Sequence, residues 1–525
     1  MMGNRALVLA AFLLLPLPLA AQETGNEDPA GKVVYDRWCA GCHGTDGRGE
    51  GPGALTMLPR PRDFTRALYQ VRTTGSGELP TDDDIMHVIN VGMPGTAMPG
   101  WEDLLSSQER ESLVTYLKSM SRFFNSTPPP AQLEFSNAPR VSDARIAEGA
   151  EIYEQVECSK CHGRAGRADG TSAPTQKDGS DLPIYPANLT QNWRFNGGGT
   201  VEDIYRILRT GLDGTPMASF SDLIDAGVIT DDQFWSLAHY VRSLSPEEPP
   251  RIREVITAAD VGDGEGELPT SPTDERWETV DKFYIPLVGQ IVVKPRWFNP
   301  RVQNLWVQAL HDSADVAMLV SWSDPSRSPD EEWAPFAQRI VETMGPKDKG
   351  STWAPGAPDQ LVVQFPLTLP TGMERPYFLQ GDARRPAYMW SWRSDHDRAV
   401  EMVARGLGTG QEQPASSQQV SAEATWADGE WRVLFRRSLA TPDSTADLQL
   451  PRATVVPVAF QAWDGNNGEA GNQAAVSTWY FLALEESVPI TVFITPLAAF
   501  LLTAVLGLVV VTRAQRREEE MPGRN

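Results

Sequence analysis

Apolar residues recur with the spacing of α-helices along the first half of the chain. Four segments show this pattern most clearly, each with apolar residues three or four positions apart. They cover residues 31–43, 106–120, 146–162 and 231–245. The pattern predicts an all-α organisation for this half of the chain.

From about Trp277 the pattern changes to alternating apolar and polar residues, which predicts strands. VAMLVSWSD, DQLVVQFPLTL, EWRVLFRRSL and VSTWYFLAL are the clearest segments. Twelve of the 16 tryptophans lie between Trp277 and Trp479, which suits a large core packed with aromatic side chains. We expect an all-β sandwich over residues 275–485, with a long loop at 406–420 and an acidic, Pro- and Gly-rich linker at 246–274.

The two ends of the chain predict export and a membrane anchor. A basic residue, an apolar stretch and the small residues Ala20 and Ala21 make residues 1–21 a signal peptide. Residues 488–512 are apolar and long enough to cross a bilayer, and a basic run begins the tail at 513–525. By the positive-inside rule the tail is cytoplasmic and the bulk of the chain periplasmic, held in the inner membrane by a single C-terminal transmembrane helix.

An internal repeat organises the helical half. DDIMHVINVGMPGTAMPGW and VEDIYRILRTGLDGTPMASF align without a gap, which places Met98 opposite Met217 and Met93 opposite Leu212. The two cysteine motifs are separated by the same number of positions as Met98 and Met217. Between the cysteine motif and the methionine of each copy the alignment shifts, so that PRDFT lies opposite PANLT. Each copy is therefore expected to be a domain of its own.

All four cysteines lie in two C-x-x-C-H motifs, formed by Cys39, Cys42 and His43 and by Cys158, Cys161 and His162. A structural zinc site needs four ligands, which the two pairs supply only if they combine. A thioredoxin-like redox pair follows a strand, whereas both motifs here follow a helical stretch. C-x-x-C-H is also the attachment sequence of c-type haem, in which the thiols bind the porphyrin covalently and the His binds the iron. Haem attachment is the interpretation that fits both motifs and export.

Met98 and Met217 are the candidate second axial ligands. Each ends a Gly-Thr-x-Met loop that follows a helix. A thioether favours ferrous iron, and iron with two protein ligands has no open position for a substrate. This predicts electron transfer rather than catalysis, and no catalytic residue is assigned. Arg72 and Arg194, which precede the ligand helices, are either partners of haem propionates or solvated surface residues.

Residues 28–122 and 143–245 resemble two class I cytochrome c domains. The likeness rests on CAGCH with GTAMPGW in the first and CSKCH with GTPMASF in the second. The resemblance implies two small helical bundles, each around one covalently bound haem c. The axial ligands it implies are His43 with Met98 and His162 with Met217.

Most of residues 275–485 resembles the haem b-binding gamma subunit of ethylbenzene dehydrogenase and related type II members of the dimethyl sulfoxide reductase family. The likeness rests on VQALHDSADVAMLVSWSDPS, RPYFLQGDARRPAYMWSWRSD, WADGEWRVLFRRSL and VAFQAWDGNNGEAGNQAAVSTWYFL. The resemblance implies a domain that collects electrons from a molybdopterin enzyme through iron–sulfur clusters and holds haem b with a Met and a Lys.

This chain departs from that family at the haem b ligands. Gln380 and Ala474 stand at the expected positions, and no lysine follows Lys349. The remaining donors are a Met and a His, namely Met373 or Met389 with His311 or His396. An apolar or turn role suits each of these better, so we expect no haem b in this region.

The formal net charge of −23 argues against a nucleic acid partner. The predicted function is a membrane-anchored periplasmic dihaem cytochrome that relays electrons between a periplasmic oxidoreductase, such as a molybdopterin enzyme, and the respiratory chain. One alternative is a sensory or binding β module with redox-reporting cytochromes. The other is a dihaem peroxidase-like enzyme, which the paired Met residues count against.

Overall fold

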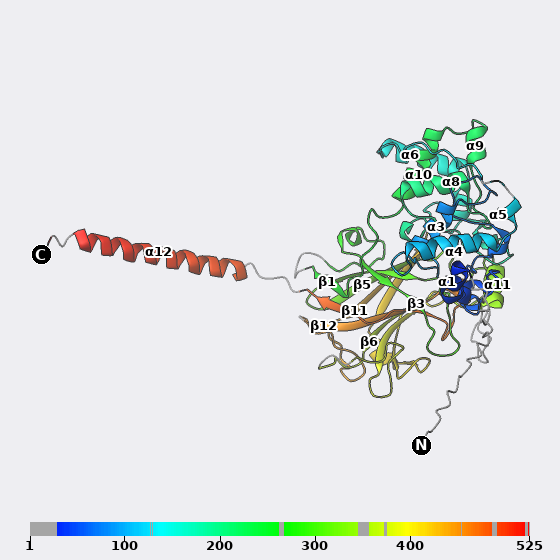
Figure 1. Cartoon of the computed structure of the whole chain (residues 1–525). Coiled ribbons are helices and arrows are strands. Elements are labelled where there is room, and N and C mark those ends of the chain that lie inside the picture. The colour runs from blue at the N-terminus through cyan, green and yellow to red at the C-terminus, as the bar shows by residue number, and fades with distance from the viewer. Residues whose placement is uncertain are drawn as a thin grey trace, which may run out of the picture.

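The computed structural model describes residues 29–126, 128, 130–261, 267–344, 356–371, 375–452, 454–485, 491–519 and 523. Three parts follow one another along the chain. We call them the first helical region (residues 30–126), the second helical region (residues 143–243) and the β region (residues 255–484). Figure 1 shows the two helical regions lying on one side of the β region, with helix α12 extending away on the other. The expected signal peptide lies outside the described residues.

The first helical region is built from helices whose ends the sequence specifies. Helix α3 begins with a capping box formed by Thr81 and Asp84, which satisfies two backbone donors at its first turn. Helix α1 crosses α4 at Gly31, where a Cβ would lie 2.1 Å from the Ser112 carbonyl oxygen, so only glycine permits this approach. The elements are α1 Ala30–Trp38, α2 Ala40–His43, η1 Ala54–Thr56, η2 Phe64–Arg66, α3 Asp82–Val91, α4 Ser107–Ser119 and α5 Phe123–Ser126.

The second helical region repeats this construction. Thr200 and Asp203 form the capping box of α8. Helix α6 crosses α10 at Gly149, where a Cβ would lie 2.1 Å from the Ser236 carbonyl oxygen. The elements are α6 Asp143–Gln155, α7 Ser159–His162, η3 Ala173–Thr175, η4 Asn192–Arg194, α8 Val201–Thr210, α9 Ser221–Asp225 and α10 Asp231–Ser243. The internal repeat predicted from the sequence therefore extends to the helix caps and crossings.

In the described residues the β region forms one 14-stranded sheet, whose main path runs β10-β11-β5-β4-β1-β14-β12-β6-β7-β8-β9. Strand β12 belongs to both halves of this path, because its first residues pair with β14 and its last with β6. The strands are β1 Val255–Asp260, β2 Phe283–Pro286, β3 Val288–Gly289, β4 Asn304–His311, β5 Asp315–Ser323, β6 Gln360–Pro366, β7 Ala387–Arg393, β8 Val400–Ala404, β9 Gln411–Glu412, β10 Ser421–Ala427, β11 Glu430–Ser438, β12 Val455–Trp463, β13 Ala475–Val476 and β14 Tyr480–Leu484.

Aromatic side chains from the two halves of the sheet meet in the core. Trp390 on β7 lies 5.9 Å from Phe435 on β11, and Trp392 lies 4.8 Å from Trp431, measured between ring centroids. Trp322, Trp390, Trp392 and Trp431 share the main buried cluster of the sheet, as the sequence predicted, whereas Trp277, Trp297, Trp333 and Trp463 lie in three smaller clusters.

Two segments of the β region differ from the sequence prediction. Residues 255–260, expected within the linker, form β1, which lies parallel to both β4 and β14. Ile256 and Ala258 on this strand are fully buried. The strand was not predicted because the acidic and proline-rich residues on both sides of it make the composition of the whole segment look like a linker. The expected loop at 406–420 contains the short strand β9 and the turn η6 Ala415–Ser417.

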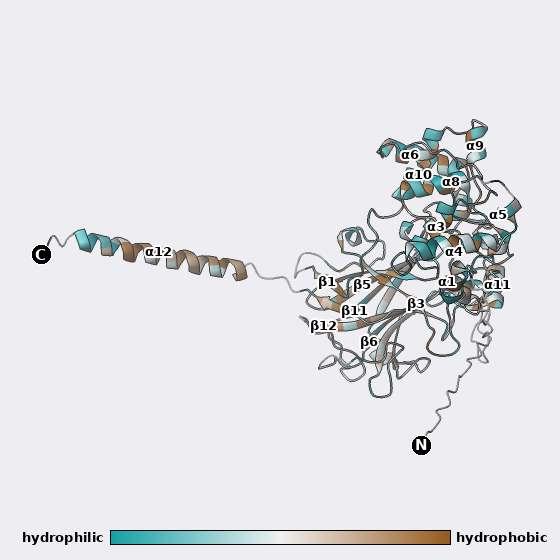
Figure 2. Ribbon diagram, in the orientation of Figure 1, coloured by the Kyte–Doolittle hydropathy of each residue, from teal (hydrophilic) through white to brown (hydrophobic). Residues whose placement is uncertain are grey.

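Two helices accompany the β region. Helix α11, Ala334–Met344, lies between β5 and β6 in the chain. Helix α12, Thr491–Glu519, is the one helix among the described residues that is long and apolar enough to cross a membrane, and none of its apolar window is buried. Figure 2 shows that apolar residues cover its inner part and polar residues its C-terminal end. The helix continues beyond residue 512, through the basic run that was expected in the tail.

Candidate haem sites

Each C-x-x-C-H motif lies where one helix ends and a short helical turn begins. Helix α2 follows Cys39 directly and carries the first motif to His43, and α7 follows Cys158 and carries the second to His162. The turns end on glycines with φ of 79° and 77°, a conformation with extended ψ that is essentially restricted to glycine; these are Gly44 and Gly163. The chain therefore turns sharply away behind each histidine.

A buried tyrosine ties each motif to the helix before it. Tyr35 Oη donates to the Gly44 carbonyl oxygen at 2.6 Å, and Tyr153 Oη donates to the Gly163 carbonyl oxygen at 2.7 Å. Both rings are almost completely buried. The same hydrogen bond therefore fixes both copies of the motif.

Each of the two histidines faces a backbone carbonyl oxygen with its Nδ1 atom. His43 Nδ1 lies 2.9 Å from the Arg62 carbonyl oxygen, and His162 Nδ1 lies 2.9 Å from the Ala187 carbonyl oxygen. A carbonyl oxygen only accepts, so Nδ1 carries the proton and Nε2 keeps its lone pair, as a metal-binding imidazole requires. Burial lowers the pKa of both histidines, which favours the neutral ring. Arg62 and Ala187 occupy equivalent places in PRDFT and PANLT, so the slipped register predicted from the sequence holds here.

Met98 and Met217 end loops with matching hydrogen bonds. Met93 N donates to the Met98 carbonyl oxygen at 3.0 Å, and Leu212 N donates to the Met217 carbonyl oxygen at 2.9 Å. Within each loop a threonine hydroxyl accepts from the methionine N, at 3.1 Å in the first and 3.2 Å in the second. Both thioethers are half-buried. The structure thus pairs Met93 with Leu212 and Met98 with Met217, as the alignment does.

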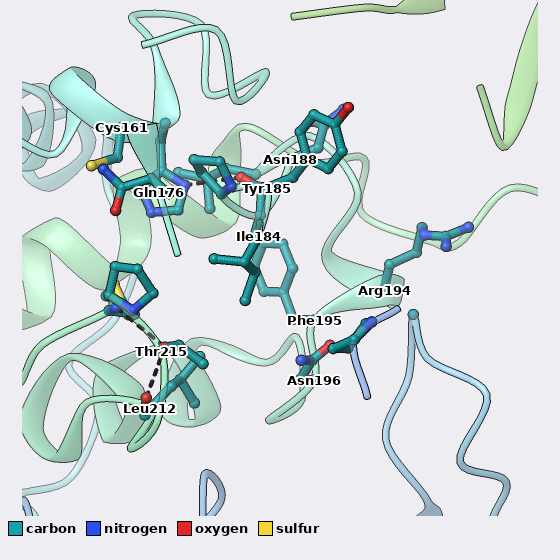
Figure 3. A pocket seen from close by; sticks show the side chains of 18 of the residues that line it. Cys161, Gln176, Ile184, Tyr185, Asn188, Arg194, Phe195, Asn196, Leu212 and Thr215 are labelled. Carbon is teal, nitrogen blue, oxygen red and sulfur yellow. Dashed lines mark hydrogen bonds between the residues drawn. The ribbon is translucent and has the colours of Figure 1, made fainter. Parts of the chain in front are cut away.

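The donor groups of the second helical region surround one cavity of about 630 Å³, lined by Cys158, Cys161, His162 and Met217. Apolar side chains such as Ile184 and Phe195 complete its walls, and Figure 3 shows these two close to each other in the middle of the view. Two thiols, an imidazole with a free Nε2 and a thioether around an apolar cavity are the donor set of a c-type haem. The residues present therefore fit that group.

The cysteines do not form the alternative zinc site. In the described part of the chain, three or more metal-binding side chains come within 4.8 Å of one another only at Asp324, Asp359 and Asp464. The two cysteine pairs are therefore not combined into one four-thiolate site. Burial raises the pKa of Cys39 to about 11 and that of Cys158 to about 12, so these free thiols are protonated at neutral pH.

Each methionine loop contacts the other helical region. Arg72 of the first helical region is completely buried, and its Nη2 donates to Asp213 Oδ1 at 2.8 Å, in the loop that ends at Met217. In return, Gly95 in the Met98 loop packs against Arg194, whose carbonyl oxygen would lie 2.3 Å from a Cβ at that position. Arg72 is therefore not a solvated surface residue. Arg194 is half-buried, and burial lowers its pKa.

The two expected haem b positions are occupied by residues with other roles. Gln380 donates from Nε2 to Gln461 Oε1 at 3.1 Å, and its Oε1 accepts from Gly408 N at 3.1 Å. Ala474 is completely buried in an apolar cluster that also contains Met389. Neither position offers an iron ligand, so these residues do not fit haem b.

The other donors weighed for haem b are also engaged. Both ring nitrogens of His311 face carbonyl oxygens, those of Asp312 and Glu485, at 3.0 and 2.6 Å. His396 Nδ1 bonds Asp395 Oδ1 at 2.7 Å. Met373 lies outside the described residues.

Sequence reasoning missed the backbone acceptors that orient the histidines and the contact of each methionine loop with the other helical region. The similarity of PRDFT and PANLT could have indicated these acceptors, because both copies keep this segment although its distance along the chain from the cysteine motif differs. No local pattern marked Asp213 as the partner of Arg72, since the two are 141 positions apart.

Residues 26–117 and 144–241 match the family model of cytochrome C oxidase, cbb3-type, subunit III, and residues 412–475 match that of ethylbenzene dehydrogenase. The chlorate reductase subunit gamma of Ideonella dechloratans is 32% identical over 239 residues, which are 44% of this chain and 86% of that protein. Cytochrome c55X of Stutzerimonas stutzeri is 32% identical over 114 residues, which are 21% of this chain and 83% of that protein.

A chain of the Kuenenia stuttgartiensis reducing HAO-like protein complex is 44% identical, with a TM-score of 0.39, over 41% of this chain and 96% of that chain. The cytochrome c matches imply covalently bound haem c. The chain belongs to a family of cytochrome c-type electron transfer components related to oxidoreductase gamma subunits, and joins class I cytochrome c domains to an ethylbenzene dehydrogenase gamma-like domain.

Proposed function

We propose that this chain is a membrane-anchored periplasmic relay that carries electrons between an oxidoreductase and the respiratory chain through two c-type haems. In this proposal residues 28–122 and 143–245 are the two haem domains and residues 275–485 are the domain that docks on the oxidoreductase. The relative named as a chlorate reductase subunit gamma supports an oxidoreductase complex as the partner, and a molybdopterin enzyme is the partner class we propose.

The side chains have separate roles at each site. In the first, Cys39 and Cys42 attach the porphyrin, and His43 and Met98 bind the iron. In the second, Cys158 and Cys161 attach it, and His162 and Met217 bind the iron. A haem iron held in this way takes up and releases one electron. The carbonyl oxygen that accepts from each Nδ1–H keeps the imidazole neutral and keeps its Nε2 pointing at the iron position. The site therefore needs little rearrangement when the charge of the iron changes.

The observation that carries the proposal is that each methionine loop contacts the helical region of the other site. Each loop that offers a thioether touches the other helical region, through Arg72 with Asp213 on one side and Gly95 with Arg194 on the other. Two one-electron centres placed in this way serve transfer from one to the other. A peroxidase-like enzyme has no use for a second methionine ligand.

A second set of contacts joins both sites to the β region. Asn299 donates from Nδ2 to the Thr56 carbonyl oxygen and accepts from Leu58 N, both at 3.1 Å, so it holds the loop after η1. Tyr185 Oη donates to Asn467 Oδ1 at 3.1 Å, from the segment that also holds His162. The cavity of the second site reaches these β-region residues. This arrangement supports the β region as the entry or exit side for electrons.

The anchor rests on α12. Its exposed apolar length suits a bilayer, and the arginines in its last turn suit the cytoplasmic face. A single-pass anchor would keep both haem domains close to the membrane, where the respiratory chain receives electrons.

The test is purification of the full chain from membranes of a host that attaches c-type haem. The expected result is covalent haem on a denaturing gel, with about two c haems per chain by pyridine haemochrome. A Cys158→Ser, Cys161→Ser double variant should retain about half of this haem. A colourless protein, or one that carries zinc, would contradict the haem assignment.

The partner is tested by isolating the chain with its neighbours from its native membrane. Co-isolation of a molybdenum oxidoreductase, with reduction of both haems when its substrate is added, is the expected result. A chain that purifies alone and is not reduced by any such enzyme would favour the binding or sensory module instead.

A further inference from the structure

Three aspartates from different strands meet at one end of the β sheet. Asp324 follows β5, Asp359 precedes β6 and Asp464 follows β12. Strands β6 and β12 are antiparallel neighbours with Gln360 opposite Trp463, so Asp359 and Asp464, which flank this pair, come together at the same end of the two strands. One carboxylate oxygen from each aspartate lies within 4.8 Å of the other two.

All three side chains are completely buried, and their hydrogen bonds do not use all of their oxygens. Asp324 Oδ1 accepts from Ser326 N at 3.2 Å, and Asp464 Oδ1 accepts from Asn467 N at 3.0 Å. The Oδ2 atoms of Asp324 and Asp464 accept no hydrogen bond from any group in the described residues. A buried carboxylate oxygen without a donor is costly, so these two oxygens point to a missing positive partner.

Asp359 is better satisfied and sets the geometry of the cluster. Its Oδ2 accepts from Ser328 N at 2.7 Å and from Trp431 Nε1 at 3.0 Å, and its Oδ1 accepts from Gly465 N at 3.1 Å. Each of these donors is fixed by the backbone or by the core. The cluster is therefore a rigid arrangement of oxygens rather than a group of mobile surface acids.

Arg301 brings one positive charge near Asp324 and Asp464. Its guanidinium lies 4.2 Å from the centre of the Tyr185 ring, and its buried Nε has no hydrogen-bond partner in the described residues. One guanidinium charge does not balance three buried carboxylates. The neighbouring Glu469 adds a fourth buried carboxylate, but its oxygens accept from Trp297, Arg301 N, Asn467 and Asp464 N.

We propose that Asp324, Asp359 and Asp464 bind a divalent cation, calcium in preference to magnesium, that is enclosed when the β region folds. An all-oxygen set of carboxylates is the ligand chemistry of calcium and magnesium. One oxygen from each aspartate lies within 4.8 Å of the other two, which is close enough for all three to bind one ion. Fixed, buried carboxylates also suit calcium, because magnesium usually keeps several waters.

This ion would lock the segment that holds the second haem site. Asp464 begins the turn η7, Gly465–Asn467, and Asn467 accepts from Tyr185 Oη. Tyr185 lies two residues before Ala187, whose carbonyl oxygen faces His162 Nδ1. Calcium thus stabilises the strand ends at the three aspartates and also the packing of the second helical region on the β region.

The test uses the haem-loaded full chain. Metal analysis should find one calcium ion per chain, and calorimetry should detect calcium binding after removal of metal with a chelator. The thermal midpoint should fall on chelation and recover with calcium, but recover less with magnesium. An unchanged midpoint with no heat of binding, or tighter binding of magnesium, would overturn the proposal.

Asp324→Asn is the sharpest variant, because the amide keeps Oδ1 as acceptor and removes the charged Oδ2. It should weaken calcium binding by at least the roughly tenfold loss that changes outside the ligand shell cause. In chelator it should raise the thermal midpoint above that of the wild type, because one buried charge is gone. Asp447→Asn, another buried aspartate of the β region, is the control and should bind calcium as the wild type does. Equal loss of binding in both variants, or a lower midpoint of Asp324→Asn in chelator, would contradict the site.

Discussion

Arg72 and Asp213 form a buried ion pair between the two helical regions, with Nη2 2.8 Å from Oδ1. The arginine side chain is completely buried and also donates to the carbonyl oxygens of Tyr69 at 2.7 Å and Thr210 at 2.6 Å. Asp213 lies in the loop that delivers Met217, so the pair connects one candidate haem site directly to the other region. Burial lowers the pKa of Arg72, and Asp213 opposes this shift.

Arg72→Met is expected to destabilise the contact between the helical regions by about 3–5 kcal/mol, because removal of one partner leaves the carboxylate unpaired. Denaturant unfolding, followed through the haem absorbance of each site, measures the loss. Arg48→Ala is the control. It removes a pair with Asp46 in which both side chains are well exposed, and should cost about 0–1 kcal/mol. Equal small effects of both variants would mean that the buried pair does not hold the regions together.

Gly95→Ala should push the Met98 loop away from the second helical region, because its Cβ would lie 2.3 Å from the Arg194 carbonyl oxygen. Gly227 also has a positive φ, but a Cβ there meets nothing within 4 Å, so Gly227→Ala carries the backbone strain alone. We expect Gly95→Ala to cost about 1–3 kcal/mol more than the control. It should also slow electron exchange between the haems in flash-reduction experiments, whereas similar rates in both variants would argue against this contact as the route.

The short-range parts of the site could be predicted from the sequence. The order Cys-x-x-Cys-His, the Gly-Thr-x-Met loop and the constant offset between the copies are local, and the structure gives both copies the same turns and hydrogen bonds. The helices and most strands followed from periodicity for the same reason, since the burial of one face leaves a trace at neighbouring positions.

Contacts between distant segments leave no such trace. Asp324, Asp359 and Asp464 come together only because β5 and β12 end where β6 begins, and no single segment of the sequence predicts the strand order. Strand β1 was hidden for a related reason, because it is stabilised by β4 and β14 rather than by its own composition. Arg72 was left open between a haem propionate partner and a solvated surface residue because its actual partner lies in the other copy of the repeat.

Stability of the β region should decline in acid partly through Asp443. Its carboxylate accepts from the hydroxyls of Ser417 and Thr445 and from the backbone N of Ala446, and these bonds lower its pKa to about 2. A lowered folded-state pKa gives stability that is fully present above the ordinary aspartate pKa and is lost as the pH falls toward 2. Urea midpoints between pH 5 and 2 should therefore fall less steeply in Asp443→Asn than in the wild type. Ser417→Ala should give an intermediate slope, and identical slopes in all three proteins would exclude this contribution.

The axial assignments predict the effect of removing each thioether. Met98→Ala or Met217→Ala should lower the potential of the haem in its own region, because a thioether stabilises ferrous iron, and should open that iron to small ligands such as carbon monoxide. Met93→Leu is the matched control in the same loop. Met93 holds the loop through its backbone N, and the equivalent position in the second copy is Leu212. The control should therefore keep the wild-type potential and stay closed to carbon monoxide. Redox titration of the three variants decides the matter: unchanged potentials in both alanine variants would reject the ligands, and a shift in Met93→Leu alone would move the assignment to that residue.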